Sequence, residues 1–228
     1  MQELQELVQW LVYILTGIPA TLLLAFIGLA FGFAYGILIA IWRVYGPPVI
    51  QMLGAAYERI MRSIPVLVLI MIFGVGLPGL FAFAGPGTNS LIMAAGFSLA
   101  LRSSAYQSGI FRSAIMAVPL GQMQAAKALG MSALEANLYI VLPQAFRLAI
   151  PAWSNEYAVV IKDTSYALVI GVSVMDKLAL NIYATAPQAF FSVVLILTLI
   201  YFCFTYPVTK LAGEHMTKKL KKLGLGGG

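Results

Sequence analysis

The chain has 228 residues, of which 61% are hydrophobic and only 10% are charged. Soluble globular proteins are about half apolar and about a quarter charged, so this composition excludes that class and indicates an integral membrane protein. The formal net charge is +6, but its basic residues collect at the ends of apolar runs, so we expect a lipid bilayer and no nucleic acid as partner. The apolar runs lack strict period-2 alternation, which favours membrane helices over a barrel.

The N-terminal stretch MQELQELVQW has two glutamates and no basic residue. It lacks the positive region of a cleavable signal peptide, so we expect it to be retained. The apolar residues that follow recur at helical spacing: Leu4, Leu7, Val8, Leu11 and Leu15. Because TGIP then interrupts the run, the pattern predicts a short helix over residues 4–15 that lies at the membrane interface.

Five membrane-spanning helices are predicted from the apolar runs. Each crossing needs about 20 mostly apolar residues. The runs cover about 20–42, 48–77, 90–118, 144–174 and 187–211, with a Gly- and Pro-rich loop between the second and third. Gly28, Gly32 and Gly36 lie four apart in the first span, which indicates close helix packing rather than a ligand site.

Basic residues fix the expected orientation. Those near span ends fall on one side: Arg43, Arg59, Arg62, Lys127, Arg147 and the lysines between 210 and 222. The positive-inside rule makes that side cytoplasmic. We therefore expect one transmembrane domain over 1–228, with the N-terminus outside. An insert at about 119–143 and a basic tail at about 212–228 are expected in the cytoplasm.

The predicted cytoplasmic insert is unusually long. Between Gln122 and Tyr139 a helical spacing, with small side chains predominating, predicts a helix: Ala125, Ala128, Leu129, Ser132 and Ala136. A helix connection needs about 2–8 residues, whereas this one takes about 25. One interpretation is an ordinary amphipathic connector between Gln122 and Tyr139. The other is a helix that docks into the groove of a soluble partner.

The insert also carries a spaced motif. Gln124-Ala125-Ala126, then Gly130, then Ile140-x-Leu142-Pro143 resembles the loop E-A-A-x(3)-G-x(9)-I-x-L-P of ABC importer membrane subunits that use an external binding protein. Gln124 stands at the Glu position of that pattern. Four further stretches resemble the polar amino-acid uptake permeases of the histidine and glutamine permease family: GIPATLLLAFIGLAFGFAYGILIAIWR, RSIPVLVLI, SSAYQSGIFRSAI with VPLGQ, and IKDTSYALVIGV.

This resemblance implies a type I ABC importer permease fold in the cytoplasmic membrane of a prokaryote. It implies an amino-acid substrate, an external solute-binding protein, two ATPase subunits, and a second permease subunit that is identical or paralogous. The residues implied to couple to the ATPase are Gln124, Ala125, Ala126, Gly130, Ile140, Leu142 and Pro143. The chain has no G-x-x-x-x-G-K-[ST] loop, so we expect it to be no enzyme, with ATP and Mg²⁺ held by the ATPase.

Ionisable residues inside spans are functional candidates because burying a charge in a membrane is costly. The candidates for substrate binding on this ground are Arg102, Glu156 and Asp163. The stretch Lys162-Asp163-Thr164-Ser165 also matches the K-D-T-S of the resembled family, which implies a place near the substrate cavity for Thr164 and Ser165, and Tyr106 is an aromatic residue that could line it. The family reads S-A-Y-x-x-E-x-x-R in the third span, whereas this chain has Gly109 at the Glu position. We therefore hypothesise that the cavity lacks a carboxylate and that Arg102 attracts a substrate carboxylate, which favours glutamate, aspartate or neutral glutamine. Alternatively, Arg102 pairs with Asp163 or with a glutamate of the neighbouring subunit.

Two rival functions remain at this stage. A self-contained ion-coupled transporter or channel would use Arg102, Lys162 and Asp163 as a relay. Such carriers often contain paired repeats, and no convincing repeat is visible in this sequence. An assembly protein would use the insert only to recruit a partner. The single histidine, His215, and single cysteine, Cys203, argue against a metal site or a Ser-His-Asp triad within the spans.

Overall fold

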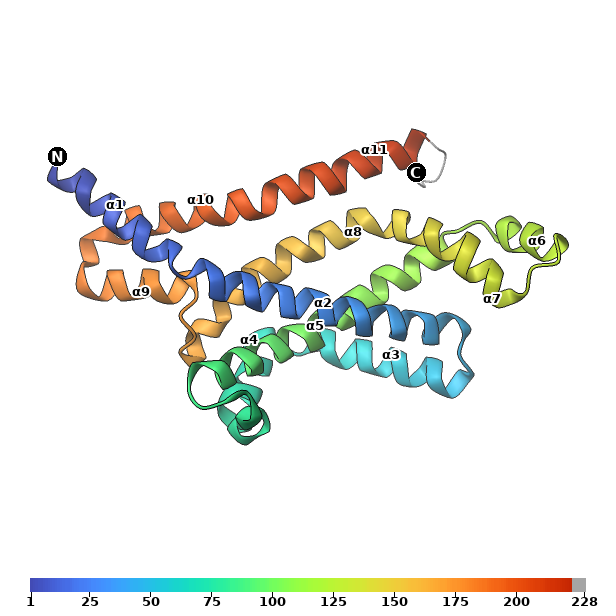
Figure 1. Cartoon of the computed structure of the whole chain (residues 1–228), viewed down its shortest axis with the longest axis horizontal. Helices are drawn as coiled ribbons and strands as arrows, with labels where there is room; N and C mark the ends of the chain where they lie inside the picture. Colours follow the sequence, from blue (N-terminus) through green and yellow to red (C-terminus); the bar gives the residue numbers. More distant parts are fainter. Residues whose placement is uncertain (223–228) are drawn as a thin grey trace.

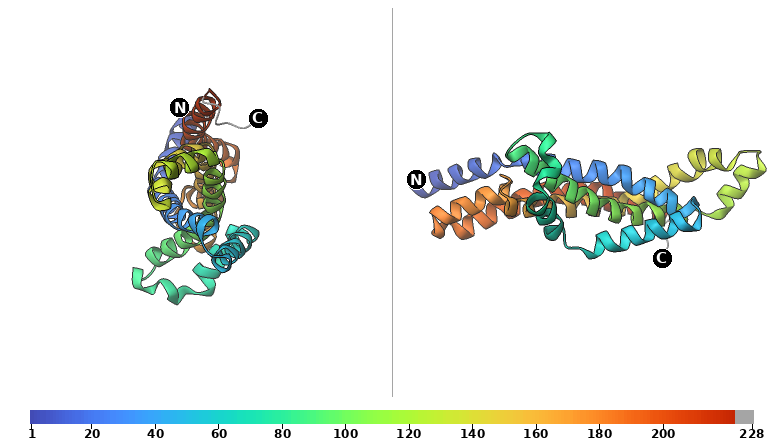
Figure 2. Two further views of the ribbon diagram at one scale, coloured as in Figure 1. Left: turned by 90° about the vertical axis from the view of Figure 1, so that its right-hand side faces the viewer. Right: turned by 90° about the horizontal axis from the view of Figure 1, so that it is seen from below.

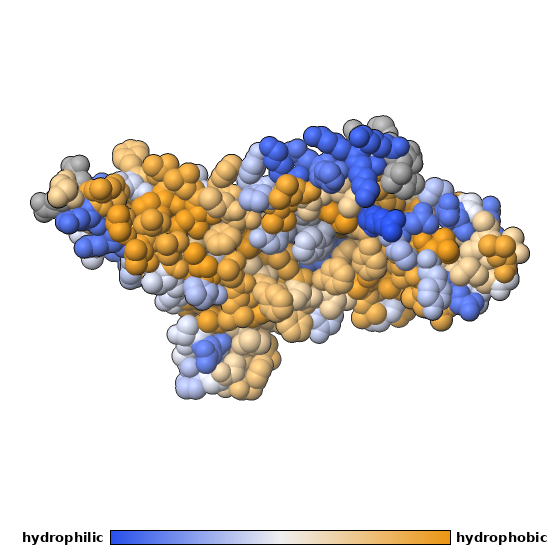
Figure 3. All heavy atoms as spheres, turned by 45° about the horizontal axis from the view of Figure 1, so that its top comes forward, coloured by the Kyte–Doolittle hydropathy of each residue, from blue (hydrophilic) through white to orange (hydrophobic). Residues whose placement is uncertain are grey.

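The computed structural model describes residues 1–222 and confirms the all-helical architecture, with no strand in that range. The helices form an elongated bundle in which the first and the last described residues, 1 and 222, lie toward opposite ends of its long axis (Figure 1). Large apolar side chains are exposed along most of the long helices. Figure 3 shows that they cover much of one face, while hydrophilic residues gather over α11 (His215–Lys222). An apolar exterior of this kind fits contact with lipid rather than water.

The centre of the bundle is the pair α2 (Ile18–Tyr45) and α5 (Thr88–Met116), which lie side by side. Gly28, Gly32 and Gly36 are buried on the face of α2 that meets α5. A Cβ atom added at Gly32 would lie 2.7 Å from Gln107 Nε2 and 2.9 Å from Ser103 Oγ. These contacts confirm that the glycines permit close helix packing.

The N-terminal helix ends where the sequence predicts it, but it continues the line of the next helix. α1 (Gln2–Leu15) runs on into α2 through one short turn, so that Leu4–Tyr45 is a single apolar rod of 42 residues. Trp10 and Ile14 pack against α9 (Met175–Thr185) and α10 (Phe190–Val208). The apolar residues that the sequence analysis placed on one face of this helix, from Leu4 to Leu15, are exposed. The rod is about 63 Å long, longer than the roughly 30 Å hydrocarbon core. The predicted interruption at TGIP is thus found as a turn at Thr16-Gly17, although α2 continues the same rod. The interfacial position of residues 4–15 stays a prediction.

The second predicted span is broken. α3 (Pro48–Ser63) and α4 (Val66–Met71), which continues as a π-helix over Ile72–Gly76, meet at 94°. Pro65 restricts the residue before it to extended backbone, and Ile64 has φ −87° and ψ 125°. A 3₁₀ segment, Pro78–Ala84, then leads to α5. A straight helix over 48–77 is therefore excluded.

The fourth and fifth predicted spans also change shape. α8 (Leu142–Asp163) gives way to a 3₁₀ segment, Thr164–Ile170, and Gly171 then turns the chain with φ +90°. α9 lies between these two predicted spans, in a segment for which the sequence analysis assigns no helix. After a short 3₁₀ turn, Pro187–Ala189, α10 continues through a π-helix, Thr209–Glu214, into α11. The last six residues of the predicted basic tail lie outside the described residues.

Length and hydropathy support two membrane-crossing helices, Leu4–Tyr45 and Pro187–Leu220. Two bent helix pairs raise this number to four if each pair is one crossing. Arg102 and Arg112 lie within α5, and charges of this kind lower the hydropathy on which such a criterion depends. The count of five spans therefore stays a prediction.

The insert projects from one end of the bundle (Figures 1 and 2). It consists of α6 (Leu120–Ala128), a turn at Gly130, α7 (Ala133–Ala136) and a π-helix, Asn137–Val141, that leads into α8. One continuous helix from Gln122 to Tyr139 was expected, and that prediction is wrong. Gly130 has φ +83°, a backbone conformation that ends a helix.

Candidate functional site

A buried charge cluster joins α5 to α8. Arg102 Nη1 lies 3.1 Å from Asp163 Oδ2 and 3.4 Å from Glu156 Oε1. The Glu156 side chain is only 4% exposed and the Arg102 side chain 13%. The predicted alternative, in which Arg102 pairs with Asp163, is thus realised, and Glu156 adds a second carboxylate.

Neutral polar side chains extend this cluster across the bundle. Ser103 Oγ donates to Glu156 Oε1 at 2.9 Å, and Gln107 Nε2 donates to Ser103 Oγ at 3.0 Å. Gln107 also donates to the Leu29 carbonyl at 3.2 Å and accepts from Trp153 Nε1 at 2.9 Å. The network therefore ties α2, α5 and α8 together. Sequence reasoning missed Ser103, Gln107 and Trp153. A usable signal was present for two of them, because Trp153 lies three residues before Glu156 and Gln107 lies four residues after Ser103, spacings that place side chains on one helix face.

Tyr106 lies beside this cluster. The guanidinium carbon of Arg102 is 4.4 Å from the centre of the Tyr106 ring, and that of Arg62 is 4.6 Å from it. Both distances are within cation–π range. Thr164 is buried and donates to the Ile161 carbonyl at 2.7 Å. The structure thus brings Arg102, Tyr106, Glu156 and Asp163 together, whereas no side-chain hydrogen bond within residues 1–222 joins Ser165 to them.

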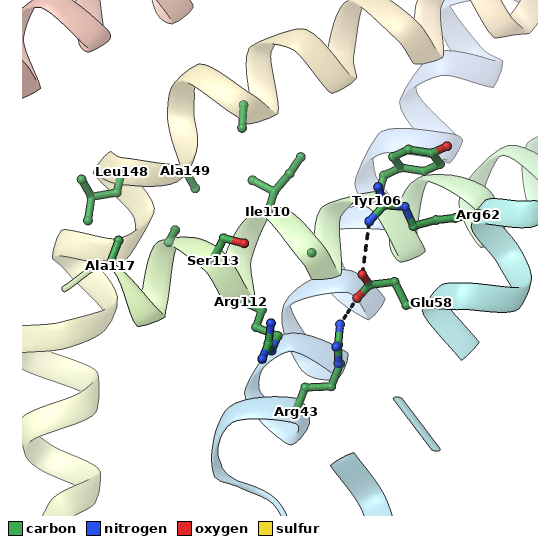
Figure 4. Close-up of a pocket in the computed structure, with 13 residues that line it drawn as sticks. Arg43, Glu58, Arg62, Tyr106, Ile110, Arg112, Ser113, Ala117, Leu148 and Ala149 are labelled. Carbon is green, nitrogen blue, oxygen red and sulfur yellow. Dashed lines mark hydrogen bonds and ion pairs between the residues drawn. The ribbon is translucent and has the colours of Figure 1, made fainter. Parts of the chain in front are cut away.

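A cavity of about 510 Å³ opens next to Tyr106, between α2, α3, α5 and α8 (Figure 4). Its charged lining consists of Arg43, Glu58, Arg62 and Arg112. Glu58 forms ion pairs with Arg43 and, at 3.2 Å, with Arg62. Figure 4 shows the Glu58 carboxylate between these two guanidinium groups.

Glu58 corrects one prediction. A Cβ atom built on Gly109 would lie 3.3 Å from Glu58 Oε1. A carboxylate from α3 therefore lies against the position at which the family pattern has a glutamate. The expectation that this region lacks a carboxylate is wrong, because the residue that supplies it lies far away in the sequence.

The turn of the insert has well-defined capping. The Met131 amide donates to the Ala126 carbonyl and the Gly130 amide to that of Lys127, which is the Schellman pattern of a helix end. In the second half, Ser132 N donates to Glu135 Oε2 at 2.8 Å and Glu135 N donates to Ser132 Oγ at 3.3 Å, which together form a capping box. Ser132 Oγ also donates to Glu135 Oε2 at 2.7 Å. These hydrogen bonds from Ser132 hold the pKa of the Glu135 carboxyl below its usual value.

The predicted coupling residues divide into two groups. Gln124, Ala125 and Gly130 are exposed on the projecting insert, whereas Ala126 is buried. Ile140 and Leu142 are half-buried, and Pro143 is exposed in the first turn of α8, where its missing N–H has no cost. The insert also exposes large apolar side chains: Leu120, Leu129, Leu134, Leu138 and Tyr139.

Residues 32–211 match the family described as the binding-protein-dependent transport system inner membrane component. The chain belongs to this family. It is 33% identical to the nopaline transport system permease protein NocM of Agrobacterium fabrum over 92% of the chain and 88% of that protein. It is 30% identical to the probable glutamine ABC transporter permease protein GlnM of Bacillus subtilis over 90% and 92%, respectively.

A solved structure of an amino acid ABC transporter with histidines matches with a TM-score of 0.79 and 28% identity, over 94% of this chain and 97% of that one. This chain is therefore an amino-acid ABC importer permease, embedded in a membrane. The relatives are named for different amino-acid ligands, so their names leave its own substrate open.

Proposed function

We propose that this chain is the translocating subunit of an ATP-driven importer for polar amino acids in a prokaryotic cytoplasmic membrane. An external binding protein delivers the substrate, and a second permease, identical or paralogous, completes the pathway. Two ATPase subunits, which hold ATP and Mg²⁺, drive the cycle. The N-terminus lies outside, and the insert lies in the cytoplasm. The observation that carries the proposal is the projecting insert with its spaced motif, on a chain of this family.

The insert has the properties of a docking element. It exposes Leu129 at 85%, Tyr139 at 70% and Leu134 at 69%. Apolar side chains on a segment outside the membrane favour burial against a partner. Ala125 and Gly130 keep part of the surface narrow, which suits insertion into a groove. We infer that this groove belongs to the ATPase and that nucleotide-driven movement of the groove shifts the insert.

The cluster around Arg102 suits the headgroup of an amino acid. Arg102 can exchange a protein carboxylate for the substrate α-carboxylate, while Glu156 or Asp163 receives the α-ammonium group. This exchange keeps the buried charges paired throughout, which avoids the large cost of an isolated charge in a medium of low dielectric. Thr164 and Ser165 follow Asp163 directly and offer hydroxyl groups nearby in the chain.

We further propose a preference for acidic or neutral amino acids such as glutamate and glutamine. Arg102 alone does not support it, because two carboxylates already compensate its charge. The support comes from the adjoining cavity, where three arginines meet one glutamate. An excess of positive charge disfavours the side chain of lysine or arginine by repulsion.

Transport in proteoliposomes tests the proposal. The chain, its ATPase and its binding protein should together take up a polar amino acid only when ATP is supplied. Arg102→Ala should abolish most uptake while the complex still assembles, and Arg59→Ala, which removes an exposed arginine of α3, serves as the control. Uptake by the chain alone on an ion gradient would refute the proposal and favour the ion-coupled transporter.

A further inference from the structure

Arg112 is a cation without an ion-pair partner within residues 1–222. It is half-buried on α5 and lines the cavity of about 510 Å³. Figure 4 shows its guanidinium group on the same side of the cavity as Arg43. A guanidinium group stays charged at any physiological pH, so Arg112 leaves a positive charge on the cavity wall that no carboxylate of the described chain offsets.

The sequence explains why Arg112 has no partner on its own helix. The family pattern S-A-Y-x-x-E-x-x-R places a glutamate three residues before this arginine, which is ion-pair spacing on a helix. Here that residue is Gly109. Glu58 approaches the same place from α3, 3.3 Å from a Cβ atom built on Gly109, but its carboxylate is already shared.

Both oxygens of Glu58 are occupied. Oε1 accepts from Arg62 at 3.2 Å, and Oε2 accepts from Arg43 and, at 3.5 Å, from Ser108 Oγ. The cavity therefore holds three cations and one anion, a net charge of +2. The rest of the lining is largely small or apolar, including Ile110, Leu148 and Ala149, so little protein polarity offsets this charge.

These features select the chemistry of a ligand. A net positive cavity rejects cations and favours an anion. Guanidinium groups bind carboxylates through paired, charge-assisted hydrogen bonds. The volume of about 510 Å³ lies within the range of small-molecule sites. The cavity also shares Tyr106 with the Arg102 cluster, so a ligand there is next to the proposed headgroup site.

We propose that Arg112, together with Arg43, binds the side-chain carboxylate of an acidic amino acid in this cavity. Arg112 is then the specificity-determining residue that allows the permease to accept glutamate or aspartate. This inference rests on the proposed function as an amino-acid importer and adds to it a site and a substrate class.

Equilibrium binding of radiolabelled glutamate and glutamine to the purified permease–ATPase complex tests this inference. The binding protein is left out, so that its own selectivity does not enter the result. Arg112→Gln should weaken glutamate binding by about tenfold or more, the loss of one charge-assisted contact, and change glutamine binding by less than about twofold. Arg112→Lys should keep most of the glutamate affinity, and Arg59→Gln should change neither.

A second variant protects the test against a folding failure. Gly109→Glu leaves Arg112 in place but gives it an acid one turn away, so it should also reduce glutamate binding selectively. Equal losses for both ligands, no change for either, or a wild-type complex that binds no glutamate would overturn the inference. ATP-driven uptake of glutamine but not glutamate would overturn it while the proposed function stands; absence of any ATP-driven uptake would instead refute the proposed function.

Discussion

Gly130 offers a direct test of the coupling role of the insert. It is exposed, has φ +83°, and has no atom within 4 Å of a Cβ position. A side chain at Gly130 therefore meets no steric obstacle within the chain and changes only the backbone energy and the docking surface. The left-handed region costs an ordinary L-residue about 1–2 kcal/mol, and asparagine tolerates it better than other residues.

We expect Gly130→Ala to shift the turn equilibrium toward open forms by a factor of about 5–30. Gly130→Asn should shift it much less. If the turn shapes the surface that meets the ATPase, the ratio of amino-acid uptake to ATP hydrolysis should be highest in the wild type. It should fall progressively in the variants Gly130→Asn, Gly130→Ala and Gly130→Val. The ratio is measured in proteoliposomes, and hydrogen exchange of the Gly130 and Met131 amides reports the turn itself.

Gly121→Ala is the matched control. Gly121 is also exposed on the insert and has no atom within 4 Å of a Cβ position, but it lies inside α6 with negative φ. Alanine should be neutral or stabilising there by up to about 1 kcal/mol. The reasoning would be refuted if Gly130→Ala and Gly130→Val opened the turn and yet retained the wild-type ratio of uptake to hydrolysis.

Two further predictions concern stability. Gly32→Ala places a Cβ atom 2.9 Å from Ser103 Oγ and should lower the free energy of unfolding by about 1–3 kcal/mol. This loss is measured as a lower Tm in detergent. Gly79→Ala, where a Cβ atom has no neighbour within 4 Å, should leave the Tm unchanged. Because the pKa of Glu135 is lowered in the fold, its contribution to the insert is present above the ordinary carboxyl pKa and is lost as pH falls through the lowered value. Hydrogen exchange at the Glu135 amide should therefore lose protection on acidification, and Ser132→Ala should make that pH dependence smaller; an unchanged dependence would contradict the capping assignment.

Local sequence patterns predicted correctly where the insert lies in the chain, but they did not predict its shape. Its length and motif spacing located it between two apolar runs. Small residues at helical spacing then suggested one helix, yet the chain turns at Gly130. The glycine was visible as part of a motif, and its positive φ gives it a conformational reason as well. The helical spacing of small residues is a property of the whole segment, so it gives no sign that a single residue, Gly130, ends the helix and turns the chain.

The breaks in the predicted spans have a related cause. Hydropathy is an average over many residues, so one Pro65 inside an apolar run barely lowers it. That proline nevertheless forces extended backbone at Ile64 and a bend of 94°. By contrast, α9 is too short and carries too many polar residues to stand out as a crossing, and its apolar face packs against α1 and α10.

Sequence alone determined that this chain is a membrane permease of an amino-acid importer, because composition, motif spacing and ordered family stretches are local properties. It also identified Arg102, Tyr106, Glu156 and Asp163 as candidates. Only the tertiary structure decided their partners. Arg102 meets Glu156 across 54 residues of sequence, and Glu58 reaches Gly109 from another helix. The partner of a charged residue can be predicted from sequence when both lie one turn apart on the same helix. When the two residues lie on different helices, the pair is known only once the packing of those helices is known.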